Sequence, residues 1–337
     1  MLPKQRMTTA EVMAEAAHDP HVDLQRLTGI EERRVCGEGE DSLTLAVGAA
    51  RDCLAHSRHG AGDLDMLISC GITKFDDGLS HRLEPPLSLS VKQQIGASRA
   101  HAFDLSNACA GMLTGVLVLE NFIRRGAIER GMVVSGEFIS NLRHEAAAKI
   151  RSVLSDRLAS LTLGDAGAAC IVERAPRAAA GIRVVTFTTL AAHSRLCIGI
   201  PSPVGPGGSM KTRAREIHRV ATVEAPPLMF EALEEAGLSL QDIDHFIPHQ
   251  TSARAIKKGV RELAERYGVT PKNVVITVDR FANTASTTHF VAMRELLRRG
   301  TLRAGEHVML LALASGLEVG VVIFTLDEMA ERYGRQD

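Results

Sequence analysis

The feature that most constrains the fold of this chain is an internal repeat. Arg124-Arg125-Gly126 and Arg298-Arg299-Gly300 each end a helical pattern and precede a predicted strand. Gly126 follows Cys109 by 17 residues, and Gly300 follows Asn283 by the same 17 residues. The repeat predicts two copies of one α/β unit, in which the equivalent loops of Cys109 and Asn283 meet at the interface between the halves.

Cys109 follows a short apolar approach and precedes the periodic helical segment 113–123. At a helix N-terminus, unpaired N–H groups and the positive end of the helix dipole favour the thiolate and lower the pKa of a cysteine. We therefore interpret Cys109 as a nucleophile. The alternative is a buried and inert cysteine, which is a common state for this residue type.

Two more polar residues stand at the ends of predicted elements. His249 follows the apolar run 246–248, and Asn283 opens a helix. Taken alone, His249 could be a structural histidine and Asn283 a helix cap. Functional groups gather at such ends because the flanking elements hold them rigidly, so the three residues together predict a site.

Composition excludes several classes of protein. The net charge of −1 over 337 residues gives no basic footprint for nucleic acid. The six cysteines are scattered without metal-ligand spacing, and no G-x-G-x-x-G follows a strand, so we expect no metal, flavin or nicotinamide cofactor. No signal peptide or long apolar run is evident, so we expect a cytoplasmic protein without membrane insertion.

The pattern of apolar residues alternates between helix and strand in both halves. We expect helices at 41–57, 88–96, 110–125, 220–236, 252–267 and 284–299, and strands at 64–70, 101–105, 131–136, 167–173, 243–248, 274–277, 306–313 and 319–326. Residues 199–209 are rich in Pro and Gly and predict a loop, either a plain connector or a lid over a tunnel.

Six short motifs occupy 28–34, 104–111, 163–168, 248–250 with Arg254, 282–284 and 315–320. In this order they resemble the thiolase superfamily and, within it, the β-ketoacyl-acyl carrier protein synthase III branch. The resemblance covers nearly the whole chain. It implies a five-layer αβαβα fold of two repeated halves, at about 1–175 and 215–337, in a single domain that usually forms a homodimer.

The resemblance also implies a mechanism. Cys109 would accept an acyl group from a coenzyme A or acyl carrier protein thioester, with no further cofactor. The backbone N–H groups of Cys109 and Gly316 would form the oxyanion hole. His249 and Asn283 would then bind the thioester oxygen of a second substrate as it becomes an enolate, whose carbon attacks the acyl-cysteine to form a C–C bond.

Glu84 departs from the housekeeping synthases, which carry an apolar residue at this place in the dimer-interface loop. It resembles enzymes of olefin and pyrone biosynthesis that join two acyl chains and use a glutamate across the dimer as a base. We therefore favour condensation of an acyl group with a second acyl or β-ketoacyl thioester in polyketide or fatty-acid-derived metabolism. The alternatives are a solvated Glu84 with decarboxylative use of malonyl carrier protein, an acyltransferase acting on oxygen or nitrogen, and a silent dimer partner.

Further assignments concern the carrier and the chain start. Arg33, Arg34 and Arg254 are candidates for contacting carrier phosphates, since Arg suits bidentate phosphate binding. Glu137 and Asp165 are interpreted as structural. The family normally begins with a core strand that ends in a Leu-Pro turn, whereas here Leu2-Pro3 stands at the start, so we expect this strand to be absent.

Overall fold

Two four-stranded sheets form the centre of the molecule in the computed structural model, which describes residues 1–175, 180–203 and 205–334. The first sheet has the strand order β4-β3-β5-β6, and the second has the order β10-β11-β12-β7. The first comprises β3 (Met66–Ser69), β4 (His101–Asp104), β5 (Arg130–Glu137) and β6 (Ala166–Glu173). The second comprises β7 (Gly181–Thr189), β10 (His245–Pro248), β11 (His307–Ala314) and β12 (Glu318–Thr325).

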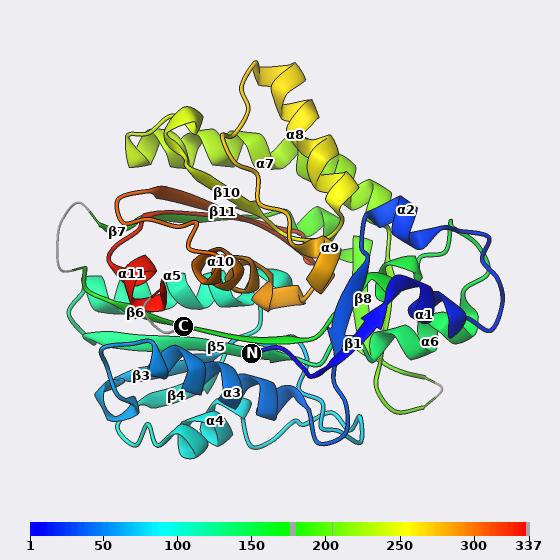
Figure 1. Ribbon diagram of the computed structural model, residues 1–337, viewed down its shortest axis with the longest axis horizontal. Helices are drawn as coiled ribbons and strands as arrows, with labels where there is room; N and C mark the ends of the chain where they lie inside the picture. Colours follow the sequence, from blue (N-terminus) through cyan, green and yellow to red (C-terminus); the bar gives the residue numbers. More distant parts are fainter. Residues whose placement is uncertain (176–179, 204, 335–337) are drawn as a thin grey trace.

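Helices cover both sheets and fill the space between them, which gives five layers (Figure 1). α3 (Ser42–Ala55) and α4 (Leu87–Ile95) lie on the outer face of the first sheet, and α7 (Ala214–Ala236) and α8 (Ala253–Tyr267) lie on that of the second. α5 (Gly111–Arg124) and α10 (Thr288–Arg298) lie between the sheets. The expected five-layer αβαβα architecture is therefore confirmed.

The repeat is visible in the strand pairing. β3 pairs parallel with β5, and β5 pairs antiparallel with β6; β10 pairs parallel with β11, and β11 pairs antiparallel with β12. β11 and β12 are buried along almost their whole length, because helices cover both faces of the sheet. Each half thus builds the same unit from the same order of elements.

Close packing of α3 on the first sheet depends on two glycines. A Cβ atom on Gly136 would lie 1.9 Å from the carbonyl oxygen of Ser42, and one on Gly167 would lie 2.2 Å from that of Leu45. Only a residue without a side chain lets the helix backbone approach the strands so closely.

Four expected elements differ from the structure. α7 begins at Ala214 and not at 220, and α10 begins at Thr288 and not at 284. The strand expected at 274–277 is reduced to a single parallel bridge between Phe246 and Val274 beside β10. The segment 199–209 is not a plain loop, because β8 (Cys197–Pro201) and β9 (Gly208–Thr212) form an antiparallel hairpin. Its Pro and Gly residues are tolerated because this two-stranded sheet consists only of edge strands.

The two sheets differ at one edge. β7 pairs with β12 along the second sheet, so this half begins by Gly181 and not at about 215 as we expected. On the corresponding edge of β6, Met1 and Gly167 exchange two backbone hydrogen bonds of 2.9 Å, and no strand of the described residues continues the pairing. β1 (Gln5–Thr8) pairs instead with β2 (Glu32–Val35) in a separate sheet.

The remaining helices lie at the periphery or connect these layers. They are α1 (Thr9–Ala14), α2 (Leu24–Thr28), α6 (Leu142–Lys149), α9 (Val278–Phe281) and α11 (Met329–Gly334). Two short 3-10 turns are central to the site, η2 (Ala108–Ala110) and η6 (Ala285–Thr287), because they open the central helices α5 and α10.

Candidate active site

Cys109 is the middle residue of η2, two residues before Gly111, the first residue of α5. The preceding residue, Ala108, has a φ of +45°, a left-handed conformation that is strained for a residue with a side chain. The side chain of Cys109 is half-buried and packs near Leu163, Met210 and Ala285. The local backbone thus fixes the thiol at the N-terminal end of the central helix.

The electrostatic surroundings of Cys109 differ from our expectation. Burial raises the pKa of the Cys109 thiol above its usual value, and the nearby ionisable groups of Cys197 and Glu137 raise it further. The predicted lowering of this pKa is wrong for this structure, because loss of solvation, which disfavours the thiolate, is the largest influence on it. Cys109 is therefore a thiol at rest near neutral pH.

His249 directly follows β10 and is only 3% exposed. Its backbone N–H donates to the carbonyl of Leu311 on β11, at 2.8 Å. Burial lowers the pKa of His249 to about 3, and the neighbouring His289 lowers it as well. The imidazole is therefore neutral near pH 7 and can donate or accept one hydrogen bond without carrying charge.

Asn283 is fixed at three points. Its backbone N–H donates to Thr162 and its carbonyl accepts from Gly164, each at 3.0 Å. Its side-chain Oδ1 accepts from the N–H of Ala285 at 3.0 Å, which forms an Asx turn at the start of η6, whose N-cap residue is Thr284. Within the part of the chain that the structure describes, no acceptor takes the Nδ2 amide, which leaves this group as a donor. The Asx turn and a functional role are therefore compatible.

The fold brings the sequence-predicted residues to one place. η2, which carries Cys109, contacts both η6, which follows Asn283, and β11, to which His249 is bonded. Gly316 lies in the turn between β11 and β12, with a φ of +130° and an exposed backbone. Elements of both halves thus meet around Cys109.

Glu84 lies outside this cluster. It is exposed on the loop before α4 and makes no hydrogen bond or ion pair with the residues that the structure describes.

The three arginines have different surroundings. Arg33 is buried, and its guanidinium donates to the carbonyls of Leu161 and Leu163 and to the hydroxyl of Thr9. It is not accessible to a phosphate, so the proposed carrier contact does not fit Arg33. Arg34 donates to the carbonyl of Lys4 at 3.0 Å, and Arg254 is exposed on the first turn of α8.

Two buried carboxylates support the site. Glu137 accepts from the backbone of Ile72 and Thr73 and from the hydroxyl of Ser286 in η6, which links the first sheet to the second half. Asp165 accepts from the backbone of Ser140 and of Cys36. Burial raises the pKa of both groups, but these donors favour the charged form. We therefore assign structural roles to Glu137 and Asp165.

Two neighbours of the site were not found from sequence. His289 packs beside His249, and Met210 of β9 packs near Cys109. The Pro- and Gly-rich composition of 199–209 concealed the strand. His289 had only its polarity on a mostly apolar helix face as a signal.

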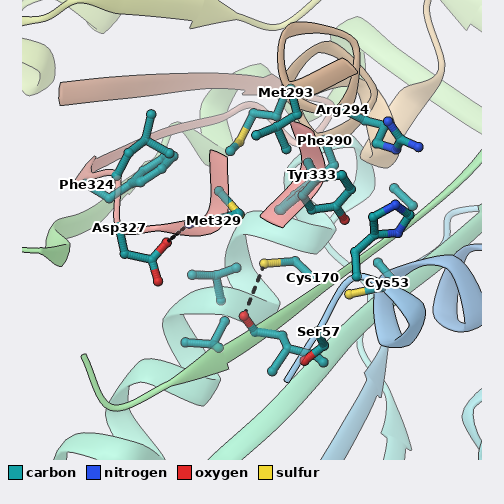
Figure 2. Close-up of a pocket in the computed structure, with 18 of the residues that line it drawn as sticks. Cys53, Ser57, Cys170, Phe290, Met293, Arg294, Phe324, Asp327, Met329 and Tyr333 are labelled. Atoms are coloured by element: carbon teal, nitrogen blue, oxygen red, sulfur yellow. Dashed lines mark hydrogen bonds between the residues drawn. The ribbon is translucent and has the colours of Figure 1, made fainter. Parts of the chain in front are cut away.

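A cavity of about 750 Å³ is separate from these residues. It lies along the outer edge of β6, and Figure 2 shows Cys53, Cys170, Phe290 and Tyr333 around it. Cys109, His249 and Asn283 do not line it. Across the described ranges, no cluster of three or more His, Cys, Asp or Glu could hold a metal ion. In the same residues, no helix combines the length and apolar character needed to cross a bilayer.

Comparison with known proteins agrees with this geometry. The family model for 3-oxoacyl-[acyl-carrier-protein] synthase III matches residues 103–191, and the model for its C-terminal part matches 233–326. The first range contains Cys109; the second contains His249, Asn283 and Gly316. The chain is 28% identical to beta-ketoacyl-[acyl-carrier-protein] synthase III of Bradyrhizobium diazoefficiens over 326 residues, which cover 95% of this chain and 94% of that protein.

Solved structures show the same fold. Synthase III from Thermus thermophilus superimposes with a TM-score of 0.80 at 26% identity, covering 97% of each chain. A cysteine-to-serine variant of OleA from Xanthomonas campestris, with bound lauric acid and lauroyl-CoA, gives 0.82 at 21% identity over 96% of each chain. With both family models in order along one thiolase-like fold, the chain belongs to the thiolase superfamily, among the synthase III-like condensing enzymes.

Proposed function

We propose that this protein joins an acyl group held on Cys109 to a second acyl or β-ketoacyl thioester by Claisen condensation. The observation that carries the proposal is the convergence of Cys109, His249 and Asn283, each held by backbone hydrogen bonds or packing at the meeting point of the two halves. The three groups supply a nucleophile and two neutral hydrogen-bond donors.

In the first half-reaction the sulfur of Cys109 attacks the carbonyl carbon of an acyl thioester. The tetrahedral oxyanion is bound by the backbone N–H groups of Cys109 and Gly316, and loss of one such donor costs about 3 to 4 kcal/mol of barrier. The C–S bond of the substrate then breaks. The carrier leaves as a free thiol with the proton that Cys109 gave up, and the acyl group stays on Cys109.

In the second half-reaction, His249 and the Nδ2 amide of Asn283 donate to the thioester oxygen of the incoming substrate. As its α-carbon loses a proton, negative charge moves onto that oxygen, where neutral donors stabilise it. The α-carbon attacks the acyl carbonyl, a C–C bond forms, and the sulfur of Cys109 leaves. The low pKa of His249 supports this role, because the ring remains neutral.

We propose Glu84 of a partner subunit as the base that removes the α-proton, with the chain acting as a homodimer. Glu84 is exposed and unpaired among the described residues, as a group that completes another subunit's site would be. Abstraction of an α-proton needs a base, whereas decarboxylation of a malonyl unit does not.

Decarboxylative condensation with malonyl carrier protein is the second candidate. It is supported by relatives named beta-ketoacyl-[acyl-carrier-protein] synthase III that align along almost the whole chain. Release of CO2 from a malonyl thioester separates the two candidates, because condensation of a β-ketoacyl thioester by proton abstraction releases none.

The carrier is proposed to dock on α8. Arg254, Lys257 and Arg261 are exposed and spaced so that they share one face of this helix. The phosphate of a pantetheine arm, whether on coenzyme A or on an acidic carrier protein, would be attracted to this face.

The experiment begins with incubation of the purified protein with an acyl-CoA and measurement of its intact mass. Wild type is expected to gain one acyl group and Cys109→Ala none, with Cys197→Ala as a control that keeps the nucleophile. Malonyl or β-ketoacyl thioester is then added and the products are identified. Acylation of Cys109→Ala, or no acylation of wild type, would contradict the proposal.

A further inference from the structure

His289 lies beside His249 in the interior. It is the second residue of α10 and is fully buried. The centroids of the two imidazole rings are 5.8 Å apart, and the ring planes are inclined by 35°. The candidate site therefore contains a pair of buried histidines, of which one belongs to the predicted cluster and the other does not.

A single carbonyl group connects the pair. The oxygen of Leu311 on β11 accepts the backbone N–H of His249 at 2.8 Å and lies 3.0 Å from Nε2 of His289. Because a carbonyl can only accept, Nε2 of His289 carries the proton, and its Nδ1 holds the lone pair in the neutral ring. The strand thus fixes both the backbone of His249 and the tautomer of His289.

The surroundings keep both rings neutral. Burial lowers the pKa of His289 to about 4, opposed by its hydrogen bond to Leu311, and burial with the influence of His289 lowers that of His249 to about 3. Within the described residues, no carboxylate or cationic side chain is hydrogen-bonded to either ring, and Nδ1 of each is buried without a partner. A proton on one ring would therefore be opposed by burial and by the other ring.

We propose that His289 is a positioning residue for His249. By donating to Leu311 and packing against the second ring, it holds the His249 ring in the orientation that keeps Nδ1 buried and leaves Nε2–H to face the substrate oxygen. This inference rests on the proposed function, in which His249 binds the forming enolate. Misplacement of such a donor by about 1 Å can cost up to about a hundredfold in rate.

The test compares His289→Leu, which removes the donor, with His289→Gln, whose amide nitrogen can occupy the position of Nε2. His245→Leu is the matched control. His245 is a buried histidine at the first position of β10, the strand that His249 follows. Its ring contacts Glu306 and Asn273, which do not belong to the candidate site. Thermal unfolding of all variants is recorded, and His289→Asn replaces His289→Leu if the latter does not fold.

Three quantities are measured: acylation of Cys109 by an acyl-CoA, the condensation rate, and the tautomer of His249 by long-range nitrogen-15 NMR of histidine-labelled protein. We expect acylation to stay within about twofold in all variants, while condensation falls about tenfold or more in His289→Leu and largely recovers in His289→Gln. The His249 spectrum should show one Nε2–H tautomer in wild type and in His289→Gln, and a mixture in His289→Leu.

Unchanged condensation and an unchanged His249 tautomer in His289→Leu would overturn the proposal. So would a loss of condensation that His245→Leu reproduces at equal stability, since this would make His289 an ordinary core residue. Failure of wild type to acylate would instead overturn the proposed function. The NMR comparison of His249 would still decide whether His289 positions that ring.

Discussion

The thiol of Cys109 combines a position at the start of a helix with a half-buried side chain. Since burial raises its pKa, the thiolate fraction is small at neutral pH and grows as the pH rises towards that pKa. We expect alkylation of Cys109 by iodoacetamide to accelerate about tenfold per pH unit from about pH 7 to 9. Peptide mass spectrometry with Cys109→Ala as control measures this, and a plateau already reached below pH 7 would contradict it.

Arg33 is predicted to matter for stability and not for carrier binding. Its replacement by Leu would leave the carbonyls of Leu161 and Leu163 and the hydroxyl of Thr9 without their donor, at a cost of about 3 kcal/mol in the free energy of unfolding. Arg34→Leu, which removes a half-buried donor to Lys4, should cost about 1 kcal/mol or less. Urea titration measures both. A raised KM for the acyl thioester at unchanged stability would contradict this assignment.

At the scale of single residues, Cys109 and Asn283 were predicted from their places at the starts of helices, and their equal spacing of 17 residues from Gly126 and Gly300 paired them. The roles of Arg33 and His289 could not be predicted, because they depend on which side of an element faces the interior. On β2 the alternation turns Arg33 inwards and Arg34 outwards, and two adjacent arginines in a sequence carry no sign of this difference. The raised pKa of Cys109 likewise depends on burial against a cluster that includes Leu163 and Ala285, which lie far away in the chain.

The contact between α3 and the first sheet makes Gly136 sensitive to the smallest substitution. Gly136→Ala would place a methyl group against the backbone of Ser42 and Ala46, and we expect a loss of about 2 kcal/mol or more. Gly259→Ala is the control, because this helical position on α8 has open space around it and should gain up to about 1 kcal/mol. Thermal unfolding compares them, and equal stability of the two variants would contradict the close approach.

Among the elements, long periodic segments were predictable and edge segments were not. The helices α3, α4, α5 and α8 lie within two residues of their expected bounds, since their apolar stripes and caps are local features. The hairpin of β8 and β9 was missed because its strands are held by pairing with each other and by contacts to distant residues such as Asn141. The segment 274–277, expected as a strand, forms only one bridge at the edge of the second sheet, where pairing also depends on distant residues.

For the whole molecule, the proposed role of Glu84 across a dimer predicts subunit complementation. Glu84→Gln and Cys109→Ala should each be inactive in condensation, because one lacks the base and the other the nucleophile. After mixing and exchange of subunits in equal amounts, about a quarter of wild-type activity should return, since half of the dimers then contain one complete site. No recovery, despite mixed dimers detected by native mass spectrometry, would contradict a base that acts across the interface.

The architecture followed from the repeat because two copies of one α/β unit can bury their sheets in few ways. The boundary between the halves could not be predicted in this way. β7 begins at Gly181 and joins the second sheet by pairing with β12, an antiparallel contact between segments far apart in the chain that local patterns do not encode.

Ala108 and Ala285, the first residues of η2 and η6, both have a positive φ, of +45° and +54°. Each half thus opens its central helix with a similar turn, which contains Cys109 in the first half and follows Asn283 in the second. In the proposed mechanism neither half can catalyse alone, because Cys109 belongs to one half and His249 and Asn283 to the other. If the chain is cut between β6 and β7, activity should therefore return only when the two fragments reassemble. The recovered activity would then report the association of the fragments.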